Sequence, residues 1–95
     1  LYICLLGDVY TQASKTIELL REMEVNVAAD VSRRKLDKQL KTADKKGVRY
    51  VLVIGENEIS SQQFVLKDLK ERKEEAHSIE RIATIIKDYR KDNSK

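Results

Sequence analysis

Two short, continuous apolar runs, each ending at a glycine, constrain the fold of this chain most strongly. They are Leu1–Leu6 before Gly7 and Tyr50–Ile54 before Gly55. Runs of this length that are rich in Val, Ile, Leu and Tyr are typical of strands buried on both faces, as in a parallel sheet. We therefore expect both runs to be buried strands, with Val25–Ala29 as a weaker strand between them in the sequence.

The segments between these runs have the periodicity of amphipathic helices. The first helix is expected over Val9–Glu24, with Asp8 as its N-cap. The second is expected over about Arg33–Lys46, with Ser32 at its start and Gly47 at its end. Their apolar stripes consist of Ala13, Ile17 and Leu20 in the first helix and Leu36, Leu40 and Ala43 in the second. Because strands and helices alternate, right-handed crossovers predict a parallel sheet in the order 2-1-3.

The second half of the chain has a different pattern. Gln63–Leu69 and about Glu74–His77 are expected to be strands joined by the charged turn Lys70–Lys73, and so short a connection makes them antiparallel neighbours. A last helix is expected from Ser78, as its cap, to about Arg90. The sequence has no Pro, no internal repeat and no Gly/Ser linker, so we expect residues 1–95 to form one domain.

The composition limits the chemistry that the chain can perform. With one His and one Cys, it lacks the ligands for a metal site and the means for an intrachain disulfide. His77 is interpreted as a surface histidine and Cys4 as a small core residue. There is no G-x-G-x-x-G and no Walker lysine, so a nucleotide enzyme is a weak option. We predict no catalytic residue, no metal and no cofactor in this domain.

The same data indicate where such a chain operates. No apolar stretch approaches the ~20 residues that a membrane span requires, and Leu1–Leu6 lacks the features of a signal peptide. No membrane contact is therefore expected, and the single cysteine makes a reducing cytoplasm the simpler assumption. The sequence starts at Leu1, inside an apolar run, which indicates a piece of a longer protein. The pI near 9.0 is compatible with an anionic partner.

The second predicted helix carries a row of cations opposite its apolar stripe. The row consists of Arg34, Lys38, Lys41 and Lys45, and the positive zone is widened by Arg33, Lys35, Lys46 and Arg49. Only Asp37 and Asp44 interrupt it. Such a row matches the spacing of phosphates on a nucleic acid, so we predict that Arg34, Lys38 and Lys45 contact phosphates. An ordinary solvated lysine face fits the charge pattern equally well.

A second group of polar residues follows the third predicted strand. Glu56 and Glu58 lie in a predicted loop at its carboxyl end, the usual ligand-binding edge of an open α/β sheet. Glu58 can accept hydrogen bonds from base amino or imino groups. Lys67, on the neighbouring strand, can donate to base oxygens or to phosphate. On charge and spacing alone, solvated surface residues are the favoured interpretation.

These residues also carry a resemblance to a known family. The segment Asp30–Glu58 resembles the anticodon-binding domain of class II aminoacyl-tRNA synthetases, and it is most similar to that of histidyl-tRNA synthetases. The matching features are Leu36-x-x-Gln39-x-x-x-Ala43-Asp44-Lys45-x-Gly47, Ile54-Gly55-Glu56-x-Glu58 and Val65–Leu69. The similarity extends from about Tyr2 to Tyr89. It implies an α/β fold of three layers, with a five-stranded mixed sheet in the order 2-1-3-4-5, strand 4 antiparallel, and three helices.

The resemblance also implies roles for single residues. In related synthetases a glutamate after the third strand and a basic residue nine positions later read anticodon bases, and Glu58 and Lys67 occupy those places. The start of the second helix contributes in such relatives, which implies Arg33 and Lys35, with Lys41 further along. Two turns depart from the family pattern. They are Ser60–Gln63, where a glycine is common, and Lys70–Lys73, where a Thr-Gly-Glu-Gln-like turn is common.

The resemblance implies a function for the domain and for its parent. The domain binds tRNA and recognises the histidine anticodon, GUG, as the C-terminal part of a histidine-tRNA ligase. The implied parent is a homodimer whose catalytic domain uses ATP and Mg, and this domain alone does not aminoacylate. Two alternatives stay open at this point. One is a synthetase-like regulatory, tRNA-sensing or protein-interaction module without ligase activity. The other is a small flavodoxin-like enzyme or cofactor binder.

Overall fold

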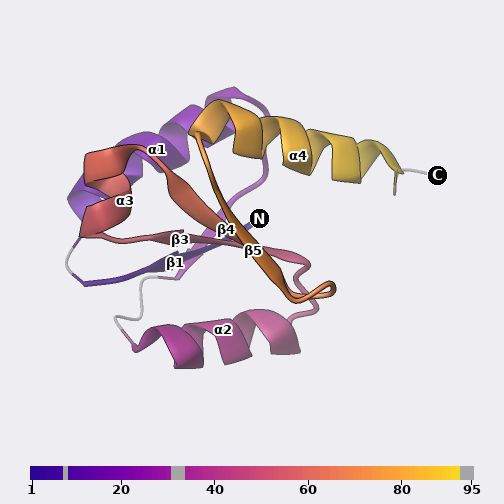
Figure 1. The fold of residues 1–95 in the computed structure, drawn as a ribbon, viewed down its shortest axis with the longest axis horizontal. Coiled ribbons are helices and arrows are strands. Elements are labelled where there is room, and N and C mark those ends of the chain that lie inside the picture. The colour runs from indigo at the N-terminus through magenta and orange to yellow at the C-terminus, as the bar shows by residue number, and fades with distance from the viewer. Residues whose placement is uncertain (8, 31–33, 93–95) are drawn as a thin grey trace.

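A computed structural model describes residues 1–7, 9–30 and 34–92, and its centre is a five-stranded mixed sheet (Figure 1). The strands are β1 (Tyr2–Leu5), β2 (Ala28–Asp30), β3 (Tyr50–Ile54), β4 (Phe64–Asp68) and β5 (Lys73–His77). Their order in the sheet is β2-β1-β3-β4-β5. β1 pairs in parallel with β2 and β3, whereas β4 is antiparallel to both β3 and β5. The predicted order and the antiparallel fourth strand are confirmed.

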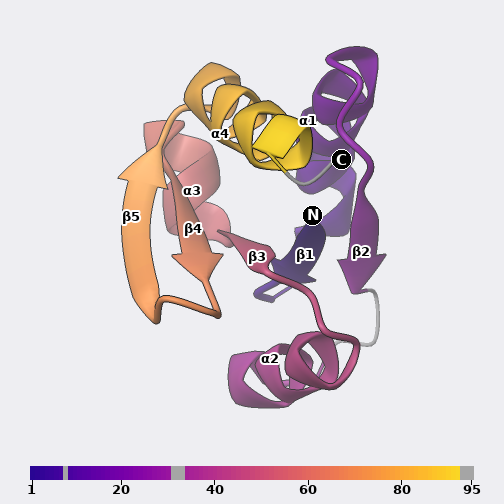
Figure 2. The same cartoon turned by 90° about the vertical axis from the view of Figure 1, so that its right-hand side faces the viewer.

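Helices cover both faces of this sheet and make three layers (Figure 2). They are α1 (Tyr10–Glu22), α2 (Leu36–Lys45), α3 (Glu56–Ser61) and α4 (Ile79–Asp92). α1 and α4 lie on one side of the sheet, and α2 lies alone on the other. No helix in the described ranges is long and apolar enough to cross a bilayer.

Alternation along the strands produces two apolar clusters, one on each face. On β4, Phe64 and Leu66 belong to the larger cluster under α1 and α4, whereas Val65 packs with the smaller cluster under α2, as does Leu69 just after the strand. β5 is almost entirely exposed and charged. Polar side chains on an edge strand oppose pairing with another chain. The charged side chains of β5 therefore protect the edge of the sheet.

The expectation of three helices is wrong, because the predicted loop after β3 begins a fourth helix, α3. Six residues are too few to establish helical periodicity in a sequence. The acidic side chains of Glu56 and Glu58 lie in its first turn, where the helix dipole favours negative charge. Gln62, with φ of 59°, ends the helix in the left-handed conformation.

Two other predicted boundaries move. α2 begins at Leu36 instead of Arg33, with Lys35 extended at the N-cap position. β2 is Ala28–Asp30 instead of Val25–Ala29, because the N–H of Val25 donates to the carbonyl of Leu20 and closes the end of α1. The predicted caps Asp8 and Ser32 lie outside the described residues, as does Arg33.

Candidate nucleic-acid interface

One buried amide side chain fixes the start of α2 against the sheet. Gln39 is fully buried. Its Oε1 accepts from the N–H of Leu5 at 3.1 Å, and its Nε2 donates to the carbonyls of Leu5 at 2.9 Å and Arg34 at 2.6 Å. The sequence analysis missed this anchor. Its signal was a polar residue inside the apolar stripe of the helix, between Leu36 and Ala43.

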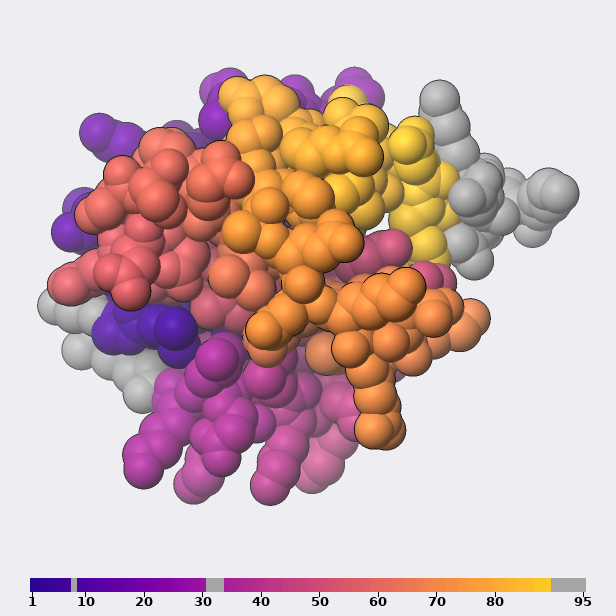
Figure 3. Space-filling view, viewed as in Figure 1, coloured from indigo at the N-terminus to yellow at the C-terminus, as the bar shows by residue number. Residues whose placement is uncertain are grey.

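The cations predicted on α2 do lie on its outer side. Lys38, Lys41 and Lys45 are exposed, and Lys35 is exposed just before the helix. Among the described residues, these four lysines form no ion pair. The side chains of α2 project into solvent along the lower edge of the molecule (Figure 3). The exposed face of α2 can therefore attract an anionic chain.

Arg34 has a different environment from these lysines. It precedes α2, so it is not part of the helical row. Its guanidinium lies 3.6 Å from the carboxylate of Asp30 and donates to Thr42 Oγ1 at 2.7 Å. Asp30 is buried and also accepts from the hydroxyl of Tyr2 at 2.8 Å. Burial and then this hydrogen bond raise the pKa of Tyr2 to about 12. Arg34 thus joins the start of α2 to β2.

The expectation that Arg49 widens the positive zone is wrong. Its Nε and Nη2 donate to the two carboxylate oxygens of Asp68 at 3.2 and 3.0 Å. The guanidinium also lies over the rings of Tyr50 and Tyr89, 5.3 and 5.1 Å from their centroids. The positive charge of Arg49 is therefore paired within the protein, by a bidentate carboxylate contact and two aromatic faces. Counting charges along a sequence does not reveal such pairing. Arg49 connects β3, β4 and α4.

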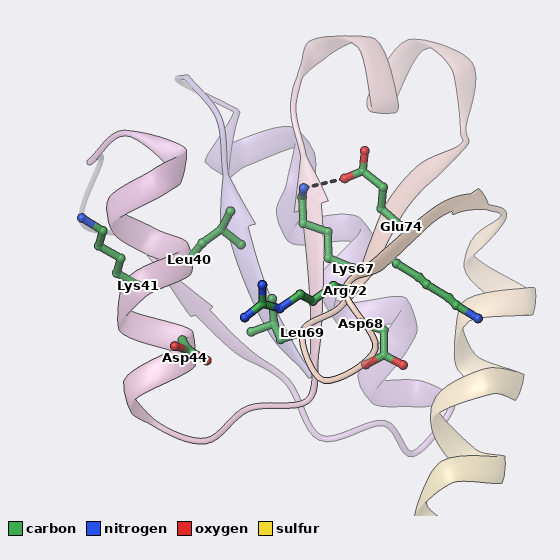
Figure 4. A pocket seen from close by; sticks show the side chains of 9 residues that line it. Leu40, Lys41, Asp44, Lys67, Asp68, Leu69, Arg72 and Glu74 are labelled. Carbon is green, nitrogen blue, oxygen red and sulfur yellow. Dashed lines mark hydrogen bonds and ion pairs between the residues drawn. The ribbon is translucent and has the colours of Figure 1, made fainter.

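A groove of about 560 Å³ lies between α2 and the β4–β5 hairpin. Its lining consists of Leu40, Lys41, Asp44, Lys67, Asp68, Leu69, Arg72, Lys73 and Glu74. Figure 4 shows Arg72 extending from the hairpin turn toward α2, and Lys67 directed at Glu74. The structure thus brings two predicted site residues, Lys41 and Lys67, to one groove.

The predicted glutamates lie at a different place. Val51 is the register partner of Lys67, so Lys67 lies beside the start of β3. Glu56 and Glu58 follow the carboxyl end of the same strand, in the first turn of α3. Three strand residues, Leu52 to Ile54, and then Gly55 lie between the two backbone positions. Glu58 and Lys67 therefore branch from backbone that lies at different positions along β3.

Cys4 and His77 belong to no metal-binding cluster among the described residues. No group of three or more His, Cys, Asp or Glu in that part of the chain is placed to hold a metal. Burial raises the pKa of Cys4 to about 11, which keeps the thiol protonated. His77 contacts the carboxylate of Glu75 at 2.9 Å on the polar edge strand. These surroundings are those of structural residues.

Comparison with known proteins identifies the same fold and a consistent set of relatives. Residues 1–89 match the model of the family described as "Anticodon binding domain". Over 74 residues the chain is 39% identical to a histidine–tRNA ligase of Lactococcus lactis. The aligned region covers 77% of this chain and 17% of the relative. Over 64 residues the chain is 38% identical to the histidine–tRNA ligase of Aquifex aeolicus. This aligned region covers 67% of this chain and 16% of the relative.

Solved structures give the same result. A histidyl-tRNA synthetase from Nostoc sp. PCC 7120 superposes with a TM-score of 0.84 at 29% identity, over 93% of this chain and 22% of that one. The RNA binding domain of a threonyl-tRNA synthetase from Cryptosporidium parvum, at 20% identity, has the same fold with a TM-score of 0.80, over 92% and 22% of the chains. The chain spans about a fifth of the length of these proteins, or less.

Proposed function

The chain belongs to the family of anticodon-binding domains, and we propose that it binds tRNA and recognises the histidine anticodon as one domain of a longer histidine–tRNA ligase. The names of its relatives support the amino-acid specificity. In this proposal the rest of the ligase, a cytoplasmic homodimer, supplies the ATP- and Mg-dependent catalytic domain. None of the relatives reported above is a regulatory protein.

The observation that carries this proposal is the row of lysines on α2. Lys38, Lys41 and Lys45 lie within two helical turns of one another on the exposed side of a helix that Gln39 fixes to the sheet. In the proposal these cations, with Lys35 and Arg34 at the helix start, hold the backbone phosphates of the anticodon stem-loop. Phosphate contacts set the position of the RNA without choosing its sequence. Arg33, predicted from the sequence to bind RNA, is proposed to contact the same stem-loop.

Base reading is assigned to two separate places. Glu58, with Glu56 beside it, accepts hydrogen bonds from base edges at the carboxyl end of β3. Lys67 donates to a base edge in the groove, with Lys41 nearby on α2. In the proposal the two places read different nucleotides of the loop. Unstacked loop bases read on exposed edges are the usual source of RNA specificity.

The phosphate part of the proposal predicts a sequence-independent loss. Lys38→Ala should weaken binding to every stem-loop, whatever its anticodon, and reduce the salt slope of log affinity by about 0.7–0.9, the value for one lost phosphate contact. Titrations at several salt concentrations measure both effects. Lys15→Ala, an exposed lysine on α1 on the other side of the sheet, is the matched control and should leave both quantities unchanged.

The base-reading part predicts a different outcome for Glu58→Gln. This variant should lower the preference for GUG over other anticodons by about 1–3 kcal/mol, the range of a specific base contact, with little change in salt slope. Equal losses of affinity for all anticodons in both Lys38→Ala and Glu58→Gln would show that the division of roles is wrong.

A further inference from the structure

Lys67 is not a free cation in the groove. Its Nζ lies 2.5 Å from Glu74 Oε2, and the two residues are direct register partners on β4 and β5. The side chain of Lys67 is 24% exposed and that of Glu74 is 61% exposed, so the pair meets water at the rim (Figure 4). Other cations of the same groove differ, because Lys41 and Arg72 form no ion pair among the described residues.

The ion pair changes what Lys67 can recognise. An ammonium group has three donors, and Glu74 accepts one, which leaves two directed elsewhere. The adjacent carboxylate lowers the positive potential that attracts a phosphate. Hydrogen bonding to a base carbonyl or ring nitrogen depends on donor position more than on net charge. The carboxylate also holds a flexible side chain in one place.

We propose that Glu74 is a specificity-determining residue, because it neutralises and orients Lys67 so that Lys67 donates to a base edge instead of binding phosphate. This inference rests on the proposed function, in which Lys67 reads a base. Glu74 is a positioning residue and remains paired with Lys67 in the complex. Lys41 and Arg72 stay available to phosphates at the same groove.

Two neighbouring glutamates of β5 provide a matched test. Glu74→Gln and Glu75→Gln each remove one negative charge with almost no change in shape. Glu75 is the register partner of Leu66, which packs under α4, so its side chain lies on the opposite face of the hairpin from Lys67. Affinities are measured for an RNA stem-loop with the GUG anticodon and for the same stem with a scrambled anticodon, at several salt concentrations.

The expected result is specific to Glu74. Glu74→Gln should bind the scrambled stem-loop about two- to five-fold tighter, the range of an exposed ion pair, and its salt slope should steepen by about 0.7. Its preference for GUG should fall. Glu75→Gln should keep the wild-type preference. In a Lys67→Met background the effect of Glu74→Gln on preference should disappear, and thermal midpoints verify that each variant is folded.

Two results would overturn the inference. One is an equal change of affinity and salt slope in Glu74→Gln and Glu75→Gln, which would make Glu74 an ordinary background charge. The other is an effect of Glu74→Gln that persists without Lys67. If the wild-type chain itself shows no preference for GUG, the proposed anticodon reading fails, and this outcome is recognisable before any variant is compared.

Discussion

Among single residues, Gln39 determines the position of α2. It satisfies both backbone groups of Leu5, which lies on a strand buried on both faces. A buried peptide group without a partner costs about 1–3 kcal/mol, so the position does not tolerate an apolar side chain. The proposed phosphate-binding face of α2 therefore depends on a fully buried residue.

Replacing this side chain should be costly. Gln39→Ala leaves the N–H and carbonyl of Leu5 unpaired and creates a cavity, and we expect the free energy of unfolding to fall by about 3 kcal/mol. Chemical denaturation measures this value. Gln12→Ala, the same substitution at an exposed position of α1, should change stability by less than about 0.5 kcal/mol. Similar small effects at both positions would contradict the assigned role.

Arg72 has an unfavourable backbone conformation. Its φ is 56°, in the left-handed region that glycine adopts most easily. Arg72→Gly should therefore stabilise the fold by about 0.5–1 kcal/mol, measured by thermal or chemical unfolding. Lys70→Gly, in the same turn but without a positive φ, should destabilise it through the entropy of the unfolded chain. A destabilised Arg72→Gly variant would show that the Arg72 side chain stabilises the fold by more than its conformation costs.

Single-residue roles were the least predictable from the sequence. The alternation of Phe64 and Leu66 against Val65 was readable, because strand periodicity depends only on the order of the residues. The pairing of Arg49 with Asp68 was not readable, because these residues are 19 positions apart and meet only when β3 and β4 pair. The sequence shows how many cations there are, but it does not show which of them form ion pairs in the folded chain.

At the scale of elements, the network around Arg49 holds the end of the β3–β4 pair. Burial raises the pKa of Asp68, but the hydrogen bond from Arg49 and those from the N–H groups of Glu71 and Lys70 outweigh it. The net result is a pKa of Asp68 below its ordinary value of 3.8. The ionised carboxylate thus organises both the strand pair and the turn that follows it.

This lowered pKa predicts a pH dependence of stability. The unfolded chain binds the Asp68 proton more readily than the folded chain, so the stabilisation is complete above the unfolded pKa and is lost as pH falls through the lower, folded pKa. Asp68→Asn should cost about 1–2 kcal/mol at pH 7 and should weaken the loss of stability below about pH 4. Unfolding measured from pH 7 to pH 2 tests this, and Asp37→Asn, on the exposed side of α2, is the comparison. An unchanged pH profile in Asp68→Asn would contradict the network.

Long, periodic elements were predictable, and short ones were not. β1, β3, α1, α2 and α4 follow from apolar runs or helical stripes in the sequence. α3 was missed because fewer than two turns give no stripe. β2 was displaced because Val25 is buried by the end of α1 and not by sheet pairing, and one sequence does not distinguish these two causes of an apolar residue.

For the whole molecule, the uneven cover of the sheet creates the proposed interface. Two long helices cover one face, whereas α2 alone covers the other and leaves the hairpin side open. The open side is the groove of Lys41 and Lys67, and the carboxyl edge of β3 carries Glu56 and Glu58. Sequence reasoning predicted these residues as one group. The register of β3 and β4 places Lys67 beside Val51 and the two glutamates beyond Ile54.

The central claim is that this chain distinguishes anticodons. The most direct test is an NMR titration of the 95-residue chain with a GUG anticodon stem-loop and with the same stem carrying a scrambled anticodon. We predict larger, saturable shifts with GUG at Gly55–Glu58 and at Lys67, and similar shifts with both RNAs along the lysines of α2. Equal shifts with both RNAs, confined to the α2 lysines, would contradict anticodon reading and leave only general affinity for RNA.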